Sequence, residues 1–314
     1  RSSSDITTNP MFNCIEFDDK ITSSIMTTKK KILNYDQIFN NSYNKFQYTF
    51  NDDIKCLFAV GANNNNCEIH HIQYGDNTNE NTLLMNQSDN IVCVASDKEW
   101  LAAANKDAVV SLYKMDDIKS QISNNSNFIK HRINSNYSLK PKFTFPSYTS
   151  SVSCISLSTE FHTMVFGTRD GSLLFCSLSD GTITKIINLK DKRRPTSLLI
   201  TQSWGFVIVA ETEIYEGFLK CYLEVYSING DFIRSSQIDN EIVSWSTYRD
   251  EKGFDYIIFS NSKNECYLSE SFYLNNLSKP FFVSPSKVAA ISFLNEESVA
   301  AISTITGDFI LSLD

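Results

Sequence analysis

The residues in this chain whose types most readily suggest chemistry are three of its histidines. His70 and His71 are adjacent in an apolar run, and adjacent residues of a strand point to opposite faces, so the two cannot hold one metal ion together. His162 follows a Glu-Phe pair in a turn and has no serine or cysteine nucleophile in a glycine-bracketed turn beside it. We therefore predict that none of the three is a metal ligand or a catalytic base.

Paired carboxylates are the second group that could do chemistry. Neighbouring aspartates lie at 18–19, 52–53 and 116–117, all in turns, where an aspartate commonly bonds to its own backbone. No neighbour in the sequence would shift their pKa values toward acid–base work. Gly171 and Gly181 are turn glycines and do not belong to a phosphate-binding loop before a helix. The sequence thus predicts no catalytic residue, no cofactor and no metal, so we do not expect an enzyme.

Clustered cations are the one charge feature that stands out, because the chain as a whole carries a net charge of -8. The members of this basic patch are Arg169, Lys190, Lys192, Arg193 and Arg194. The arginine fork pairs well with carboxylate or phosphate, so the patch is expected to bind an acidic peptide or protein surface, or an anionic membrane surface. Ordinary solvated loop charge is the alternative interpretation. The negative net charge weighs against nucleic acid as a partner.

The elements that must position these residues are short strands. Residues 151–189 contain four apolar, β-branched runs separated by turns, two of which carry Asp-Gly. Asp-Gly between alternating runs is a strong hairpin pattern, since the turn needs positive φ angles. This stretch therefore predicts a four-stranded antiparallel meander. Asp170 is the predicted structural turn residue of this repeat, and Asp107 is that of the preceding repeat.

The meander recurs along the chain at intervals of about 45 residues, a spacing typical of propeller blades. First runs of the repeats begin near Phe12, Ile54, Ile91, Val152, Thr196, Ile242 and Val288. We predict an all-β chain that forms a single seven-bladed β-propeller over residues 1–314. Six blades is the alternative, because the first two repeats are poorly marked.

Three segments fall outside the regular pattern. Residues 1–9 are polar and are expected to be a linker from an upstream region, and residues 116–142 are expected to form an exposed polar insertion. The last repeat lacks a fourth strand, which in closed propellers is usually supplied by the other terminus. Residues 1–9 are the only candidate that we identify for it, and the alternative is a ring in which the last outer strand is absent.

The eight cysteines do not have the pattern of a disulfide scaffold. Cys56, Cys93 and Cys154 occupy what we take to be equivalent first strands, and no C-x-x-C pair occurs. Cysteine at such positions acts as a small buried hydrophobe. We expect free thiols, and with them a cytoplasmic protein that is peripheral to membranes.

The repeat resembles the WD repeat. In that family an aspartate in the turn between second and third strands precedes a tryptophan by six positions, and here Asp107 precedes Tyr113 and Asp170 precedes Cys176 by that distance. The Trp-Asp dipeptide and the Gly-His pair before the first strand are both absent from the sequence. The resemblance implies a WD-type propeller whose network of side chains is incomplete.

Residues 145–247 are also similar to the C-terminal propeller of BEACH-domain proteins of the neurobeachin and beige type. The segments GTRDGSLLFCSLSDG and YSINGDFI carry most of that similarity. The resemblance implies a non-catalytic protein-interaction platform within a scaffold for vesicle, lysosome or autophagy traffic. A stand-alone WD adaptor without a BEACH domain is the first alternative. A propeller hydrolase or lyase is the second, although such sites need acidic residues in the first strands, where this chain has Ser, Thr, Cys and apolar residues.

Overall fold

The computed structural model describes most of the chain from residue 91 onward and several earlier strands. The described ranges are 13–16, 46–51, 56–63, 66–73, 79–85, 91–118, 120, 138–147, 150–275, 277–294, 299–304 and 308–312. Before residue 91 only the backbone pairing of the strands is described. The predicted linker at residues 1–9 and part of the predicted first repeat lie outside these ranges.

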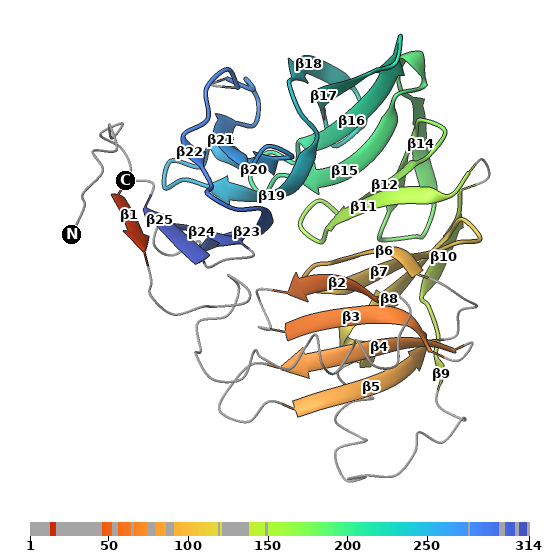
Figure 1. Cartoon of the computed structure of the whole chain (residues 1–314). Coiled ribbons are helices and arrows are strands. Elements are labelled where there is room, and N and C mark those ends of the chain that lie inside the picture. The colour runs from red at the N-terminus through yellow and green to blue at the C-terminus, as the bar shows by residue number, and fades with distance from the viewer. Residues whose placement is uncertain are drawn as a thin grey trace.

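Four complete blades come from local stretches of the chain, and each is an antiparallel four-stranded sheet (Figure 1). Blade 6–10 has β6 (Ile91–Ser96), β7 (Trp100–Asn105), β8 (Val109–Lys114) and β10 (Phe143–Pro146). Blade 11–14 has β11 (Val152–Ser158), β12 (Thr163–Thr168), β13 (Ser172–Ser177) and β14 (Ile183–Asn188). Blade 15–18 has β15 (Arg194–Ile200), β16 (Val207–Tyr215), β17 (Phe218–Tyr226) and β18 (Phe232–Ile238). Blade 19–22 has β19 (Ile242–Arg249), β20 (Asp255–Asn261), β21 (Glu265–Glu270) and β22 (Phe282–Val283).

Two further sheets flank these blades. One joins the two ends of the described chain, in the order β1 (Asn13–Glu16), β25 (Asp308–Ser312), β24 (Val299–Thr304) and β23 (Val288–Leu294). The other has β2 (Phe46–Asn51), β3 (Cys56–Asn63), β4 (Asn66–Gln73), β5 (Asn79–Met85) and β9 (Ser138–Leu139). The short β9 pairs with β5 in parallel.

The inner strands of successive sheets lie side by side in the order β2, β6, β11, β15, β19 and β23, which gives a partial ring (Figure 1). The all-β propeller architecture with antiparallel blades is confirmed, and the prediction of seven blades is wrong. The difference arises in the first ninety residues, where period-two patterns do not show which strand of a sheet is innermost. The predicted repeats put the run 46–51 at the end of the first blade, but it is the inner strand β2 of its sheet, and Cys56 begins the second strand β3 instead of a first strand.

The N-terminal region does supply the outer strand of the last sheet, as expected for propellers, but by a different segment. β1 pairs with β25 through Asn13↔Ser312 to Glu16↔Phe309. The sequence assigned this run to the first blade and proposed residues 1–9 for closure. Pairing two strands from opposite ends of the chain leaves β25 without a free edge.

The core lies between the blades, and blades 11–14, 15–18 and 19–22 are each covered on both faces by their neighbours. In β12, Met164 and Phe166 belong to the cluster shared with blade 6–10, whereas Val165 belongs to the cluster shared with blade 15–18. All three side chains are fully buried. Burying one such side chain contributes about 1.5–3 kcal/mol. Burial on both faces explains why the second strands have continuous apolar runs rather than alternation.

The predicted insertion is packed at its two ends. Ile118 and Leu139 are 0% and 1% exposed, and β9 adds a strand to the neighbouring sheet. The other described residues at these ends include five exposed polar side chains, namely Asp116, Asp117, Ser120, Lys140 and Lys142, so burial there is confined to the two apolar residues. The middle of the segment, 121–137, lies outside the described residues. In the described parts of the chain no helix is long and apolar enough to cross a bilayer.

The five cysteines whose side chains are described are free, as predicted: Cys93, Cys154, Cys176, Cys221 and Cys266. Burial raises the pKa of the Cys266 thiol to about 12. It raises the pKa of Cys154 to about 12 as well, against the lowering effect of hydrogen bonds from Ser153 and the Gly167 backbone. These thiols remain protonated in the folded protein at neutral pH.

We predict that these five thiols react with a disulfide reagent such as DTNB only after unfolding, since the thiolate is the nucleophile and its formation is suppressed by burial. Labelling at pH 8 in buffer and in denaturant, followed by peptide mass spectrometry, measures each cysteine separately. Fast labelling of Cys154 or Cys266 in the folded protein would contradict the prediction.

Candidate interaction face

One end of the blades gathers the turns between second and third strands, and these turns share a design. A buried polar residue ends the second strand, and its side-chain oxygen accepts a hydrogen bond from the backbone amide four residues later. The pairs are Asn105 Oδ1 with Val109 N at 3.0 Å, Thr168 Oγ1 with Ser172 N at 3.2 Å, and Asn261 Oδ1 with Glu265 N at 3.1 Å. The residue three positions later has positive φ each time, at Ala108, Gly171 and Asn264.

Asp170 is a structural turn residue in this arrangement, as predicted from its spacing. Its Oδ1 accepts hydrogen bonds from the hydroxyls of Ser150, at 3.0 Å, and of Thr168, and its amide donates to Ser150 Oγ at 3.1 Å. Ser150 precedes the first strand β11, which is the region where the WD family has its Gly-His pair. A serine thus links the turn to the first strand in place of that histidine.

Asp107 does not have the same role, although its spacing to Tyr113 is the same. Its side chain is exposed, and the turn is closed by Asn105, whose backbone carbonyl also accepts the Ala108 amide at 3.3 Å. The spacing therefore locates the turn correctly in both blades but identifies the bonding residue in only one. Asn105 and Asn261 were missed, and a polar residue that ends an apolar run was the pattern that could have found them.

The turn of blade 11–14 lies against the loop that leads into blade 15–18. Leu189 N donates to Gly171 O at 2.8 Å, and a Cβ atom on Gly171 would lie 2.8 Å from the Arg193 carbonyl oxygen. Gly171 also has φ of 88°, so glycine is needed there for both conformation and space. The loop contains the 3-10 turn η2 (Lys190–Lys192), in which Asp191 and Lys192 have positive φ. The structure therefore places the turn that contains Arg169 against the loop that carries the other members of the basic patch.

Four members of the basic patch are exposed, namely Arg169, Lys190, Lys192 and Arg194. Arg193 is only 7% exposed, so its prediction as a surface residue of the patch is wrong. Consecutive residues of an extended chain point to opposite sides, so the Arg193-Arg194 pair sends one side chain inward and the other into solvent. The surface charge that remains is carried by the other four residues.

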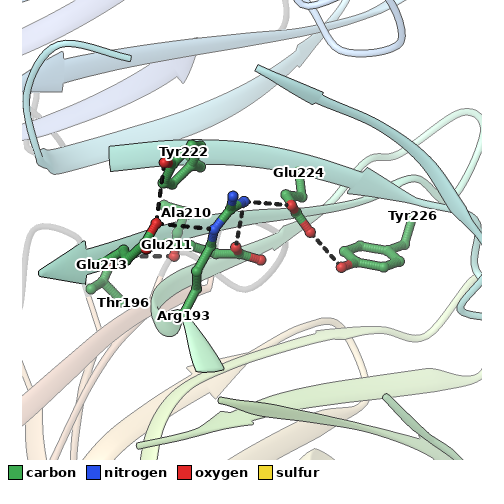
Figure 2. Close-up of polar contacts among 8 residues, drawn as sticks. All are labelled: Arg193, Thr196, Ala210, Glu211, Glu213, Tyr222, Glu224 and Tyr226. Atoms are coloured by element: carbon green, nitrogen blue, oxygen red, sulfur yellow. Dashed lines mark hydrogen bonds and ion pairs between the residues drawn. The ribbon is translucent and has the colours of Figure 1, made fainter. Parts of the chain in front are cut away.

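Arg193 lies at the centre of a buried polar cluster within blade 15–18 (Figure 2). Its Nη1 is 3.0 Å from Glu224 Oε1 and 3.9 Å from Glu211 Oε2, and its Nε is 3.6 Å from Glu213 Oε2. The guanidinium also stacks on the Tyr222 ring, 3.5 Å from its centre. Pairing on this scale offsets much of the cost of burying the charge.

The cluster contains more carboxylate than the buried arginine can neutralise. Burial, followed by the nearby Glu224 carboxylate, raises the pKa of Glu211 from 4.5 to about 9, against the lowering effect of Arg193. Tyr226 donates its hydroxyl to Glu224 at 2.5 Å, and burial together with that hydrogen bond raises the pKa of Tyr226. At neutral pH we therefore take Glu211 as protonated and neutral.

The cluster is a structural device rather than a reaction centre, because Glu211 and Glu224 are 0% and 4% exposed. The sequence could have indicated this buried cluster, because β16 and β17 carry acidic residues within apolar runs. In the described part of the chain no group of three or more His, Cys, Asp or Glu residues is placed to hold a metal ion. His70 and His71 are consecutive in β4, and His162 is an exposed turn residue with φ of 50°.

Comparison with solved structures supports a WD40-like β-propeller fold. The chain is similar to BBS1N in its complex with ARL6DN, with a TM-score of 0.57 and 15% identity over 82% of this chain and 74% of that one. It is similar to the WD40 β-propeller domain of Doa1 as well, with a TM-score of 0.57 and 10% identity over 85% and 78% of the two chains. No family model and no curated protein matches the sequence, and these comparisons do not link it to BEACH-domain proteins.

We predict that Glu211→Gln stabilises the domain at pH 8 and has little effect near pH 5. The folded state keeps the Glu211 proton where the unfolded chain has lost it, so the stability contribution of this group falls as pH rises from 4.5 to about 9. We expect the variant to melt about 5 °C higher at pH 8, or about 2 kcal/mol. Melting curves from pH 5 to 9 test this, with the exposed Glu251→Gln as control. Equal pH dependence in parent and variant would overturn it.

We predict that Asp170→Ala lowers the free energy of unfolding by about 1–2 kcal/mol, because the variant loses hydrogen bonds to Ser150 and Thr168. The matched control is Asp107→Ala, which we expect to change stability by less than about 0.5 kcal/mol. Denaturant unfolding of both variants measures the difference. The assignment fails if the two substitutions have the same effect.

Proposed function

We propose that this propeller is a non-catalytic protein-interaction platform, and that an acidic peptide or protein surface binds across Arg169, Lys190, Lys192 and Arg194. The observation that carries the proposal is the exposure of these four cations on one end of an acidic chain, held in place by the Gly171 contact. Like charges gathered on one rim repel each other, and an acidic partner offsets that repulsion. The similar propeller BBS1N is itself described in complex with another protein.

The wider setting belongs to the same proposal. The similarity of residues 145–247 to BEACH-domain propellers supports a role as the C-terminal propeller of a trafficking scaffold, cytoplasmic and peripheral to membranes. A stand-alone WD adaptor is the alternative. The transcript sequence upstream of Arg1 separates the two: a BEACH domain encoded in the same reading frame supports the scaffold, and its absence supports the adaptor.

Catalysis by the propeller is the competing class of function. Of the described acidic residues, the buried pair Glu211 and Glu224 is the kind of group that a hydrolase would use. It is engaged with Arg193 and Tyr226 and is enclosed by the blade. We therefore assign the function to the rim, by which we mean the four exposed cations, and not to the buried Glu211–Glu224 pair.

We predict that charge reversal on the rim abolishes binding of acidic partners. The variant combines Lys190→Glu, Lys192→Glu and Arg194→Glu, and it keeps Arg193 because that side chain holds the buried cluster. The matched control reverses Lys98, Lys252 and Lys279, which are exposed at the opposite ends of the strands. A fluorescent glutamate-rich peptide is the probe. We expect the rim variant to lose at least about tenfold in affinity at low salt and the control to lose little.

The salt dependence provides the second criterion. Binding by the parent should weaken as ionic strength rises, since exposed charges are screened beyond about 10 Å at 0.1 M salt. If the folded rim variant binds the peptide as well as the parent does, the cations are ordinary solvated loop charge and the binding face lies elsewhere.

A further inference from the structure

The turn between β16 and β17 departs from the design shared by the other described blades. Thr212 occupies the position of Thr168, because each pairs with the first residue of its inner strand, Arg194 or Val152. Three residues, 169–171, separate Thr168 from the next strand. In blade 15–18 the ladder instead continues beyond Thr212, and residues 213–220 lie between Thr212 and its partner Cys221.

This extension is a regular β-hairpin. Its pairs are Glu213↔Lys220, Ile214↔Leu219 and Tyr215↔Phe218. The two turn residues, Glu216 and Gly217, have φ of 51° and 82°, as a two-residue hairpin turn of type I′ requires. Three paired residues at about 3.3 Å each carry the turn about 10 Å beyond Thr212. Figure 1 shows β16 and β17 as the long pair of strands in this blade.

The tip of the hairpin is apolar on both of its faces and is exposed to solvent. Ile214, Phe218, Leu219 and Tyr215 are 80%, 74%, 53% and 48% exposed. Strand alternation places Ile214 with Leu219 on one face and Tyr215 with Phe218 on the other. Neither face covers a core, and the other described blades close without such an extension. A group of large apolar side chains held out in this way marks an interaction site.

Cations lie near the foot of the hairpin, and the buried Arg193 cluster supports it. Arg194 pairs with Thr212 at the foot of the hairpin. Lys190 and Lys192 lie in the loop that leads into β15, just before Arg194. Lys220 Nζ sits 3.9 Å from the centre of the Tyr215 ring. At the foot, the guanidinium of Arg193 stacks on the Tyr222 ring, and the Tyr222 hydroxyl donates a hydrogen bond to Glu213 at 3.2 Å. The buried cluster therefore fixes the direction in which the hairpin projects.

We propose that the hairpin tip, residues 214–219, inserts into the interfacial layer of an anionic membrane while Arg194, Lys190 and Lys192 contact lipid phosphates. A bilayer about 40–45 Å thick with a hydrocarbon core of about 30 Å has a polar layer of about 5–8 Å on each side. A tip that projects about 10 Å beyond Thr212, the partner of Arg194, is long enough to span that layer, so apolar groups reach the acyl boundary when Arg194 is at headgroup level. Tyr215 and Lys220 suit the interface, where an amphipathic ring and a long cationic side chain are both favoured.

The inference goes beyond protein binding by the cations, because uncharged side chains carry it. Glu216 provides an internal check, since it is the charged residue of the turn and its carboxylate opposes entry into an anionic surface. Glu216→Gln should therefore bind membranes more tightly. A protein groove lined with carboxylates would also bind the cations, but that binding would not require lipid.

The experiment is co-sedimentation of the chain with phosphatidylcholine vesicles that contain about 30% phosphatidylserine. The tip variant, Ile214→Ser with Phe218→Ser, keeps every cation, and we expect its vesicle affinity to fall at least about tenfold. Trp204→Ser is the matched control, since Trp204 is 61% exposed at the opposite end of β16 and should leave the affinity unchanged. Circular dichroism and melting curves confirm that each variant is folded.

A second measurement reads insertion directly. Phe218→Trp should gain fluorescence quenching from lipids brominated on their acyl chains, relative to the parent. The proposal is overturned if the parent does not bind the anionic vesicles, if the tip variant binds them as well as the parent does, or if Phe218→Trp gains no quenching. It is also overturned if light scattering shows that the parent is a dimer and that the only effect of the tip substitutions is to make it a monomer, because the tip then contacts a second copy of this chain. Loss of vesicle binding with intact binding of the acidic peptide separates this inference from the protein-binding proposal.

Discussion

The constraint on which this structure depends is that no blade can bury both of its faces alone. Met164 and Phe166 of β12 face one neighbouring blade and Val165 faces the other, and all three are fully buried. Removing a neighbour would expose a complete apolar face, at about 25 cal/mol for each Å². The strand interiors are therefore fixed by packing, and variation is confined to the ends of the strands. Both proposed binding features lie there.

The buried Arg193 cluster adds a second constraint to one of these ends. The chain enters β15 at the point where Arg193 turns inward to Glu224, Glu211 and Glu213. An unpaired charge at this depth would destabilise the fold strongly, so the loop cannot move without disrupting the cluster. The surplus carboxylate is accommodated by a proton on Glu211, whose pKa is raised by burial. The same arginine thus holds the loop of cations and the foot of the hairpin in one orientation.

Much of this fold was predictable from residue 91 onward, where apolar runs and turn residues predicted the strands of four blades. Earlier in the chain the strands were found but their order was not, because a pattern of period two does not distinguish an inner strand from an outer one. β2 and β1 were both assigned to the wrong sheet positions for this reason. At the candidate site, the turn that carries Arg169 lies against the loop of cations, which is compatible with the predicted grouping. The sequence could not tell Arg193 from Arg194, since their difference is one of direction along an extended backbone.

The contrast between the turns of neighbouring blades explains why the site is found in blade 15–18. In the other described turns a threonine or asparagine oxygen closes the second strand, and only three residues separate it from the third strand. Thr212 stands at the equivalent position, but the strand continues past it into eight further residues, of which 214–219 are exposed. The extra length carries the apolar tip about 10 Å beyond Thr212, the residue that pairs with the exposed Arg194. Because the apolar and cationic groups differ in height, the face matches a surface that is itself layered, with charge outside and hydrocarbon within.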